Sequence, residues 1–243
     1  MTARYALYYA PRPEEALAVA ASQWLGWTPD NGRARALPAS TGLDPQRLGE
    51  IVAEPRRYGF HGTLKPPMAL VDDVTEADLL AAVGRFAATQ RAFTAPSLTL
   101  AALSDFLALV PTTRSPELQD LADRCVIEFD EFRRPADEAE LARRRKNGLT
   151  PRQDELLLRW GYPYVLEEWR FHLTLTGRLA DEAERTAVMN ALRQRFRSLI
   201  DRPLPVRDLC IFRQSAPERP FTVLARFRLG GGRLVSSEVW RAS

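Results

Sequence analysis

Two four-residue stretches of this sequence carry an imidazole, a hydroxyl group and a leucine in the same order. They are His61-Gly62-Thr63-Leu64 and His172-Leu173-Thr174-Leu175. The chain has two histidines, and each begins one of these stretches. An imidazole with an unperturbed pKa near 6.5 gains and loses a proton close to neutral pH. The matched pair therefore indicates general acid–base chemistry by two histidines.

The residues around both motifs alternate between apolar and polar, which predicts two half-buried β-strands. Residues two apart share one face of a strand, so each histidine is expected to point the same way as its threonine. A cation falls on each polar face as well. These faces are expected to carry His61, Thr63 and Lys65 in the first strand, and Arg170, His172 and Thr174 in the second.

Two imidazoles that face one another across a cleft suit the cleavage of a phosphodiester. A neutral histidine takes a proton from the attacking hydroxyl group or water, and a protonated one gives a proton to the leaving oxygen. The hydroxyl groups of Thr63 and Thr174 are expected to donate to the non-bridging phosphate oxygens. Lys65, Arg170 and Arg178 are the candidates for added positive charge at this phosphate.

Other residues near the motifs have a plainer interpretation. A single histidine on a strand is commonly a hydrogen-bonded structural residue, and only the matched pair favours catalysis. The basic pair Arg56-Arg57 is typical of a solvated loop, although its place before His61 would also suit an anion contact. Tyr58 falls on the face of Phe60 by strict alternation, so it is expected to reach a substrate only if a bulge intervenes. Gln214 is not favoured as a site residue.

Composition limits the class of protein. The net charge is 34 − 31 = +3, which permits an anionic ligand without demanding nucleic acid. Cys125 and Cys210 form no CxxC motif and are expected to be buried, reduced thiols of a cytoplasmic protein. So few histidines and cysteines do not favour a metal centre, and no cofactor is expected. No apolar run reaches membrane-spanning length, and no signal peptide is expected.

The elements around the motifs predict an α+β fold. Residues 26–45 are expected to form a loop, and 230–232 a turn before a short terminal strand. Thr75 and Asp78 resemble a capping box, and Thr150 with Pro151 resembles a helix start. Strands are predicted at 4–10, 97–103, 106–110, 204–212 and 221–229, and helices at 14–25, 43–52, 75–90, 117–129 and 181–200.

The order of elements repeats along the chain: a motif strand, a helix and a pair of strands, twice. The two histidines are 111 residues apart (172 − 61). This weak duplication predicts a single bilobal domain over 1–243, with motif-bearing segments at about 54–132 and 165–230. Two pseudo-symmetric lobes, each an antiparallel sheet with helices, would bring the motif strands face to face across a central cleft. The charged stretch 133–160 is interpreted as a helical insert, a solvated helix rather than a lid.

The paired motif resembles the signature of the two-histidine (2H) phosphoesterase superfamily, two copies of H-x-T/S-hydrophobic. This resemblance implies a bilobal α+β protein with a central cleft that opens or forms cyclic phosphodiesters without a metal. Three stretches further resemble an uncharacterised branch associated with bacterial phosphonate-degradation operons; they are 4–8, 57–65 and 171–179. That branch implies a cyclic ribose phosphate as substrate, whereas the long spacing and the insert depart from compact RNA-processing members.

The expected partner is therefore a small phosphorylated molecule, most simply a sugar or nucleotide cyclic phosphate. Long RNA is not expected, because the chain lacks a basic track beside either motif. Three alternatives stay open: an enzyme that processes or ligates RNA ends with 2′,3′-cyclic phosphates, a module that binds a nucleotide or RNA without turnover, and a structural protein. The sequence leaves open which histidine is the acid and what the oligomeric state is.

Overall fold

The computed structural model describes residues 3–39, 41–146, 148–231 and 233–234. Their strands are β1 Arg4–Tyr9, β2 Trp27–Thr28, β3 Arg33–Ala34, β4 Gly62–Met68, β5 Phe93–Ala95, β6 Leu98–Leu103, β7 Phe106–Pro111, β8 Leu173–Thr174, β9 Leu204–Val206, β10 Asp208–Gln214, β11 Thr222–Arg228 and β12 Arg233–Leu234. Their helices are α1 Ala16–Leu25, α2 Pro45–Ile51, α3 Ala53–Arg56, α4 Glu76–Thr89, α5 Pro116–Glu128, α6 Glu138–Arg145, α7 Pro151–Trp160 and α8 Glu182–Phe196, with short 3-10 turns at Asp130–Phe132 and Leu166–Glu168. The predicted mixture of helices and antiparallel strands is confirmed.

Most of the expected helices form close to their predicted bounds because their ends carry local signals. Thr75 caps α4, and the reciprocal contacts of a capping box join it to Asp78. Thr150 caps α7, with Pro151 in its first turn. Residues 43–52 form α2, and α3 follows it directly. The predicted loop 26–45 contains the small β2–β3 hairpin, and the strand predicted at 204–212 divides into β9 and β10.

The eight strands of the main sheet follow the order β12-β11-β10-β1-β4-β8-β7-β6. The strands that carry the two motifs, β4 and β8, are therefore neighbours within one sheet. A single antiparallel residue pair, Gly62 with Leu173, joins them. This differs from the expected strands that face each other across a cleft. We call this junction the β4–β8 seam.

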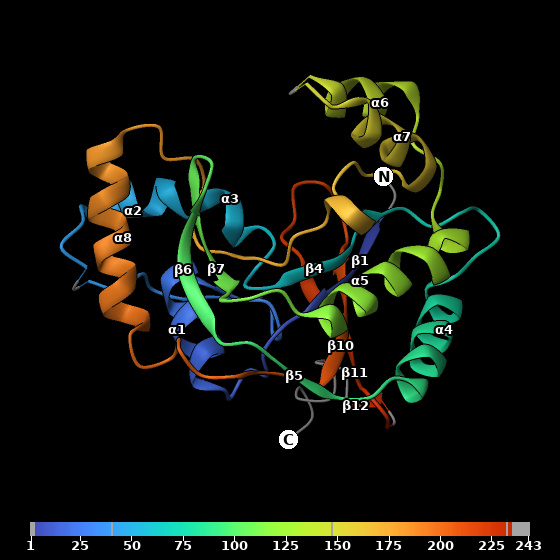
Figure 1. Ribbon diagram of the computed structural model, residues 1–243, viewed down its shortest axis with the longest axis horizontal. Helices are drawn as coiled ribbons and strands as arrows, with labels where there is room; N and C mark the ends of the chain where they lie inside the picture. The colour runs from blue at the N-terminus through green and yellow to red at the C-terminus, as the bar shows by residue number, and fades with distance from the viewer. Residues whose placement is uncertain (1–2, 40, 147, 232, 235–243) are drawn as a thin grey trace.

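Each motif strand lies on the same side of the β4–β8 seam as the strand pair that follows the other motif in the sequence. β4 adjoins β1 and, beyond it, β10 and β11, whereas β8 adjoins β7 and β6. The helices follow the same division, since α4 contacts β10 and β11 while α8 contacts β6. Figure 1 shows α8 (orange) and α4 (teal) on opposite sides of the molecule. The chain thus exchanges its two strand pairs between the halves of the sheet.

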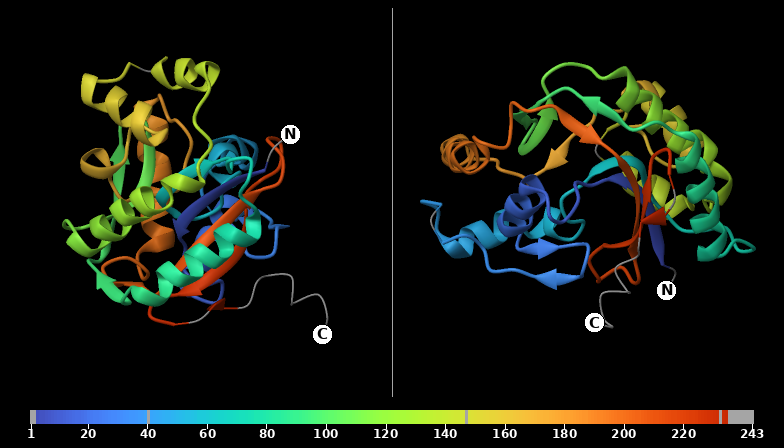
Figure 2. Two further views of the ribbon diagram at one scale, coloured as in Figure 1. Left: turned by 90° about the vertical axis from the view of Figure 1, so that its right-hand side faces the viewer. Right: turned by 90° about the horizontal axis from the view of Figure 1, so that it is seen from below.

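The main hydrophobic core lies against one face of the sheet and continues under α1, α4, α5 and α8. Leu7, Leu64 and Leu173 from the central strands are fully buried in it. The opposite face of β1, β10 and β11 carries a smaller aromatic cluster, including Tyr8 and Phe212. The helices of the insert, α6 and α7, project from one end of the molecule (Figure 2, left). Within the described residues, no helix is both long and apolar enough to cross a membrane.

The sequence predicts a turn at the glycine triplet 230–232 and a short terminal strand after it. Gly230 has a φ of +73°, which fits the expected turn. Gly232, the last glycine of the triplet, lies outside the described residues. The strand β12 pairs with β11 after it.

Candidate active site

The two motifs meet on one face of the sheet. His61 directly precedes β4, and His172 directly precedes β8, so the ladder itself begins one residue after each histidine. The pairing of Gly62 with Leu173, extended by one residue in each direction, places His61 opposite Thr174 and Thr63 opposite His172. Gly62 and Leu173 point into the core, and the other four side chains share the opposite face.

Both imidazoles are oriented by the same local hydrogen bond. The His61 Nδ1 lies 2.9 Å from the Gly59 carbonyl oxygen, and the His172 Nδ1 lies 2.9 Å from the Arg170 carbonyl oxygen. A carbonyl oxygen only accepts, so each Nδ1 must carry the proton of this bond. The neutral imidazole then has an unprotonated Nε2, which can accept a proton. In the first motif this Nε2 lies 3.3 Å from the Thr63 hydroxyl oxygen.

Burial weakens proton binding at both imidazoles. Loss of solvent lowers the pKa of His61 to about 4, a shift that the nearby charge of His172 increases and the bond to Gly59 opposes. Loss of solvent also lowers the pKa of His172, against the bond to Arg170. Both histidines are therefore neutral at pH 7 in the protein without ligand.

Tyr8 packs directly against His61. Its ring stacks on the imidazole with 3.9 Å between the ring centroids and 23° between the planes. Tyr8 is 1% exposed, and burial raises the pKa of its phenol well above its usual value. Sequence reasoning missed this residue, because the pairing of β1 with β4 cannot be read from either strand alone. Phe106 lies beside His172 without stacking on it, with 5.8 Å between the ring centroids and 55° between the planes.

Tyr58 also reaches the site, contrary to strict alternation. Its ring lies 6.0 Å from the His61 ring and stacks on Phe221. Gly59 explains the difference, because its φ of +73° turns the chain between Tyr58 and His61. A side chain at position 59 would also press against the Pro29 ring, with a Cβ at 2.8 Å from its Cγ.

Lys65 does not lie on the histidine face, so its predicted place there is corrected. A β-bulge in β4 shifts the register between Thr63 and Lys65, so that Lys65 pairs with Leu7, a residue of the main core. Its side chain is 1% exposed, and its ammonium group donates to the Val126 carbonyl oxygen of α5 at 2.9 Å. Burial lowers its pKa to about 8, although Asp130 at 3.5 Å opposes this shift.

The two predicted arginines are on the surface. The Arg170 side chain is exposed, and its backbone carbonyl rather than its guanidinium contacts His172. The Arg178 side chain is 73% exposed and lies 3.4 Å from Asp105 in the turn between β6 and β7. The structure therefore brings His61, Thr63, His172 and Thr174 together, and leaves the three expected cations outside this group.

The second motif is held by side chains because its strand is so short. The Trp24 indole of α1 donates to the Leu175 carbonyl oxygen at 2.9 Å, and the Trp169 indole donates to the Thr63 carbonyl oxygen at 2.8 Å. The Thr176 hydroxyl accepts from the Leu107 amide of β7 at 2.9 Å. These bonds fix the position of β8 where the ladder supplies a single pair to β4.

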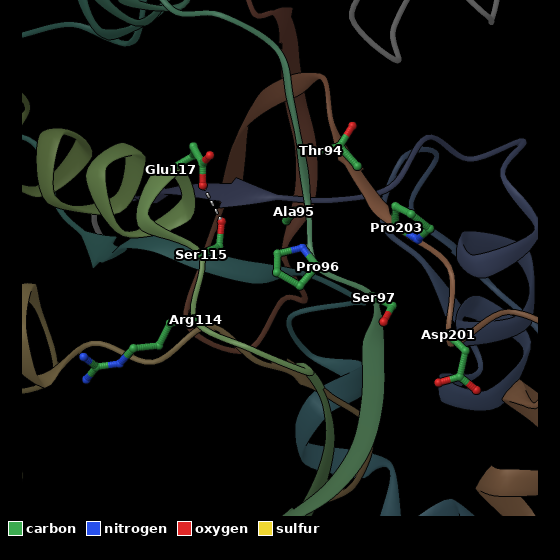
Figure 3. Close-up of a pocket in the computed structure, with 9 residues that line it drawn as sticks. All are labelled: Thr94, Ala95, Pro96, Ser97, Arg114, Ser115, Glu117, Asp201 and Pro203. Carbon is green, nitrogen blue, oxygen red and sulfur yellow. Dashed lines mark hydrogen bonds between the residues drawn. The ribbon is translucent and has the colours of Figure 1, made fainter.

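Two further findings on the described residues concern ligand binding. No three side chains of His, Cys, Asp or Glu among them are grouped to hold a metal ion. An open cavity of about 500 Å³ lies between β5, the start of α5 and residues 201–203 (Figure 3). Its polar lining includes Arg114, Glu117 and Asp201, and none of the predicted site residues lines it. The cavity is thus separate from the histidine site.

Comparison with known proteins identifies the family. The chain belongs to the family described as "Protein of unknown function (DUF1045)", which matches residues 63–222 and thus includes Thr63, His172 and Thr174. A relative from Janthinobacterium sp. (strain Marseille), named ribose 1,5-bisphosphate phosphokinase PhnN, is 39% identical over 231 residues, 94% of this chain and 51% of the relative. A relative of the same name from Laribacter hongkongensis (strain HLHK9) is 38% identical over 184 residues, 74% of this chain and 41% of the relative. The chain spans about half the length of these relatives or less.

Proposed function

We propose that this protein is a phosphoesterase that opens a small cyclic phosphodiester by two-histidine acid–base catalysis. The observation that supports this most is the register at the β4–β8 seam, which sets each histidine opposite the threonine of the other motif. The matching Nδ1 contacts add to it, because they leave both Nε2 atoms available for proton transfer. Paired imidazoles in one site are the groups that this reaction needs.

The proposed reaction adds one water molecule across a P–O bond. The neutral histidine takes a proton from a water molecule while the oxygen of that water attacks phosphorus. The ring P–O bond then breaks, and the leaving oxygen takes a proton from the second histidine, which is protonated. The product is a phosphate monoester with a free hydroxyl group. A proton passes between the histidines through solvent before the next turnover, so atoms and charge balance.

We assign the base to His61 and the acid to His172. A pKa of about 4 leaves His61 neutral at pH 7, as a base must be. His172 is the acid by elimination, and the negative charge of a bound phosphate raises its pKa. The hydroxyl groups of Thr63 and Thr174 donate to the non-bridging oxygens as charge builds on them. These steps use the chain's own side chains and require no metal ion.

The relatives suggest the substrate. Membership of the 2H phosphoesterase superfamily, with two motif-bearing halves derived from a duplication, is part of this proposal. Both relatives are named for an enzyme that acts on ribose 1,5-bisphosphate. Opening a cyclic phosphate of a phosphorylated ribose yields a ribose that carries phosphate monoesters, the kind of molecule such a kinase takes. A role in cytoplasmic phosphonate catabolism fits this sequence of reactions.

Phosphokinase activity is a second candidate, because both relatives carry that name. However, the sequence has no Walker A motif, G-x-x-x-x-G-K-[ST]. Lys65 follows Leu64 and Lys146 follows Arg145, so neither lysine has the required glycine before it. About half of each relative lies outside the matched region. We therefore infer that the kinase name describes the other half of those proteins.

A substrate screen tests the proposed function. The purified protein is incubated in excess EDTA with a ribose cyclic phosphate, with nucleoside 2′,3′-cyclic phosphates and with an RNA oligomer ending in a 2′,3′-cyclic phosphate. The H61A/H172A double variant is the control. We expect a monoester product from the small substrates with the wild type and none with the control. Binding without turnover would favour a non-catalytic module, activity restored only by a divalent ion would contradict the mechanism, and ATP-dependent phosphorylation of ribose 1,5-bisphosphate would favour the kinase.

A further inference from the structure

The guanidinium group of Arg4 is held by hydrogen bonds to a neutral side chain, so its positive charge is not compensated there. Arg4 lies at the start of β1, on the same face as Tyr8. Its Nε and Nη2 atoms both donate to the Gln214 Oε1, at 2.9 Å and 2.6 Å. The Gln214 amide nitrogen in turn donates to the carbonyl oxygens of Pro217 and Arg219, at 3.2 Å and 2.7 Å. Gln214 is 2% exposed, so the guanidinium has one fixed orientation.

Two other arginines packed against this sheet have carboxylate partners. Arg226 lies 2.8 Å from Asp30, and Arg12 lies 2.7 Å from Asp208. In both cases the charge of the guanidinium is compensated by the protein. Gln214 has no net charge, so Arg4 keeps its full positive charge and remains able to attract an anion.

Arg57 brings a second cation to the same place. Its Nη2 donates to the Pro217 carbonyl oxygen at 2.7 Å, the same atom that Gln214 contacts. The Arg57 carbonyl oxygen accepts from the Phe221 amide at 2.7 Å, and the Arg4 Cζ lies 5.7 Å from the Phe221 ring. In the part of the chain that the structure describes, neither guanidinium forms an ion pair with a carboxylate.

This pair of arginines adjoins the histidine site through aromatic side chains. Tyr58 follows Arg57 directly, stacks on Phe221 with 5.3 Å between the rings, and lies 6.0 Å from the His61 ring. Tyr8 lies 6.3 Å from the Phe221 ring and stacks on His61. The two arginines are thus linked to His61 through the rings of Phe221, Tyr58 and Tyr8, whereas the three cations expected from the motifs lie elsewhere.

We propose that Arg4 and Arg57 form a second anion-binding subsite beside His61, which holds a phosphate monoester of the substrate while its cyclic phosphodiester lies between the histidines. This proposal rests on the proposed function and narrows the substrate to a sugar cyclic phosphate that carries a second phosphate. Guanidinium groups donate paired hydrogen bonds to phosphate oxygens, which makes arginine well suited to this task. The name of the relatives, with its two phosphates on ribose, agrees with this substrate class.

Calorimetric titration with ribose 5-phosphate tests the subsite, with ribose as the comparison ligand. This probe has the monoester and lacks the cyclic diester. We expect the wild type to bind ribose 5-phosphate at least about 10-fold more tightly than ribose, because charge-assisted hydrogen bonds hold the phosphate. Equal binding of the two ligands by the wild type would overturn the proposal without any variant.

Three variants test whether the phosphate of ribose 5-phosphate binds at Arg4 and Arg57. Arg4→Gln and Arg57→Gln remove one cation each, and Gln214→Glu keeps Arg4 while neutralising its charge. Each is expected to weaken binding of ribose 5-phosphate at least about 10-fold and to leave binding of ribose unchanged. Arg193→Gln is the matched control, since Arg193 is an exposed arginine of α8 that also donates to an amide oxygen, that of Asn190. Wild-type affinity in both arginine variants, or an equal loss in the control, would contradict the subsite.

The same titration separates this proposal from the proposed function. H61A is expected to bind ribose 5-phosphate like the wild type, because the monoester does not lie on His61. If the variants lose binding while no cyclic phosphodiester is cleaved, the subsite stands and the proposed reaction is wrong. If cyclic phosphodiesters with and without the second phosphate are cleaved with equal kcat/KM, the reaction stands and the subsite is wrong.

Discussion

The two imidazoles are oriented in the same way, by residues close to them in sequence. Each Nδ1 contacts the carbonyl oxygen two residues earlier, so the tautomer and the ring orientation are fixed before a ligand binds. Burial beside Tyr8 keeps His61 neutral, and burial also disfavours the charged form of His172. Two predictions follow for the histidines, and a third concerns Lys65.

Replacing either histidine is expected to stop turnover without unfolding the protein. In H61A and H172A, we expect kcat to fall at least about 10²-fold, because each removes one proton-transfer step. The rate on a ribose cyclic phosphate and the thermal melting temperature are measured together. Wild-type turnover in one variant would remove that histidine from the mechanism, and a large loss of Tm in both would assign them a structural role.

The pH dependence of kcat/KM is expected to be bell-shaped with an acidic maximum. The base must be deprotonated, so activity rises with pH through the His61 pKa of about 4. The acid must be protonated, so activity falls as pH rises through the His172 pKa, which lies below 6.5 in the free enzyme. The maximum is therefore expected between about pH 4 and pH 6.5. A profile that is flat from pH 5 to pH 9, or rises above neutrality, would contradict two titrating imidazoles.

Lys65 is expected to matter for stability and not for phosphate binding. Lys65→Met removes the donor to the Val126 carbonyl oxygen, which is expected to lower the free energy of unfolding by about 1–3 kcal/mol. We expect kcat/KM to stay within about threefold of the wild type. Lys146→Met, at the exposed end of α6, is the control for removing a lysine. A fall in kcat/KM of more than about 10-fold at unchanged stability would return Lys65 to the active site.

At the scale of elements, the site depends on the seam between β4 and β8. One residue pair joins these strands, so their relative position relies on side chains that pack across the seam. Gly62 is central to this packing, because the Phe171 ring occupies the space that a Cβ at position 62 would need. A wider seam would separate His61 from Thr174, and Thr63 from His172.

Gly62→Ala is therefore expected to damage both stability and catalysis. The added methyl group forces the Phe171 ring away, at a cost of about 1–3 kcal/mol, and we expect kcat/KM to fall at least about 10-fold. Gly49→Ala is the control, since Gly49 lies in α2 with its nearest contact at 3.9 Å and helical alanine is favourable. Phe171→Leu in the Gly62→Ala background should recover part of the activity. Wild-type kinetics in Gly62→Ala would show that the seam tolerates expansion.

At the scale of the whole molecule, the charge distribution favours a small substrate. The densest basic run, Arg143 to Lys146, belongs to the insert, and its arginines pair with Glu140 and Asp154. Four cations thus meet two carboxylates and the run keeps a net positive charge, but it is one short patch and not a track along an RNA backbone. Arg4 and Arg57 have no carboxylate partner among the described residues and are linked to His61 through aromatic rings, an arrangement that suits a single second phosphate.

We expect faster turnover of a ribose cyclic phosphate than of an RNA oligomer that ends in a 2′,3′-cyclic phosphate. The ratio of the two kcat/KM values measures this preference. Raising salt from 50 to 200 mM should weaken binding of the small substrate only modestly, because few phosphates are contacted. A preference for the oligomer that declines steeply with salt would instead assign the protein to RNA end-processing.

Local sequence alone determined much of this protein. Period-two alternation predicts that each histidine shares a face with its threonine, and the single pair of Gly62 with Leu173 sets each histidine opposite the threonine of the other motif. Capping residues set the starts of α4 and α7, because a cap needs only the backbone of the next turn. Membership of the 2H phosphoesterase superfamily stays a proposal, whereas the family match rests on residues 63–222 and the relatives are matched over about half of their length or less.

Tertiary structure decided the features that depend on residues far apart in the chain. The bulge that turns Lys65 into the core arises from pairing with β1, and strict alternation could not predict it. The exchange of strand pairs between the halves of the sheet, the stacking of Tyr8 on His61 and the meeting of Arg4 with Gln214 all join distant segments. A periodic pattern specifies which face a residue occupies, but the neighbour on that face is chosen by the packing of the whole core.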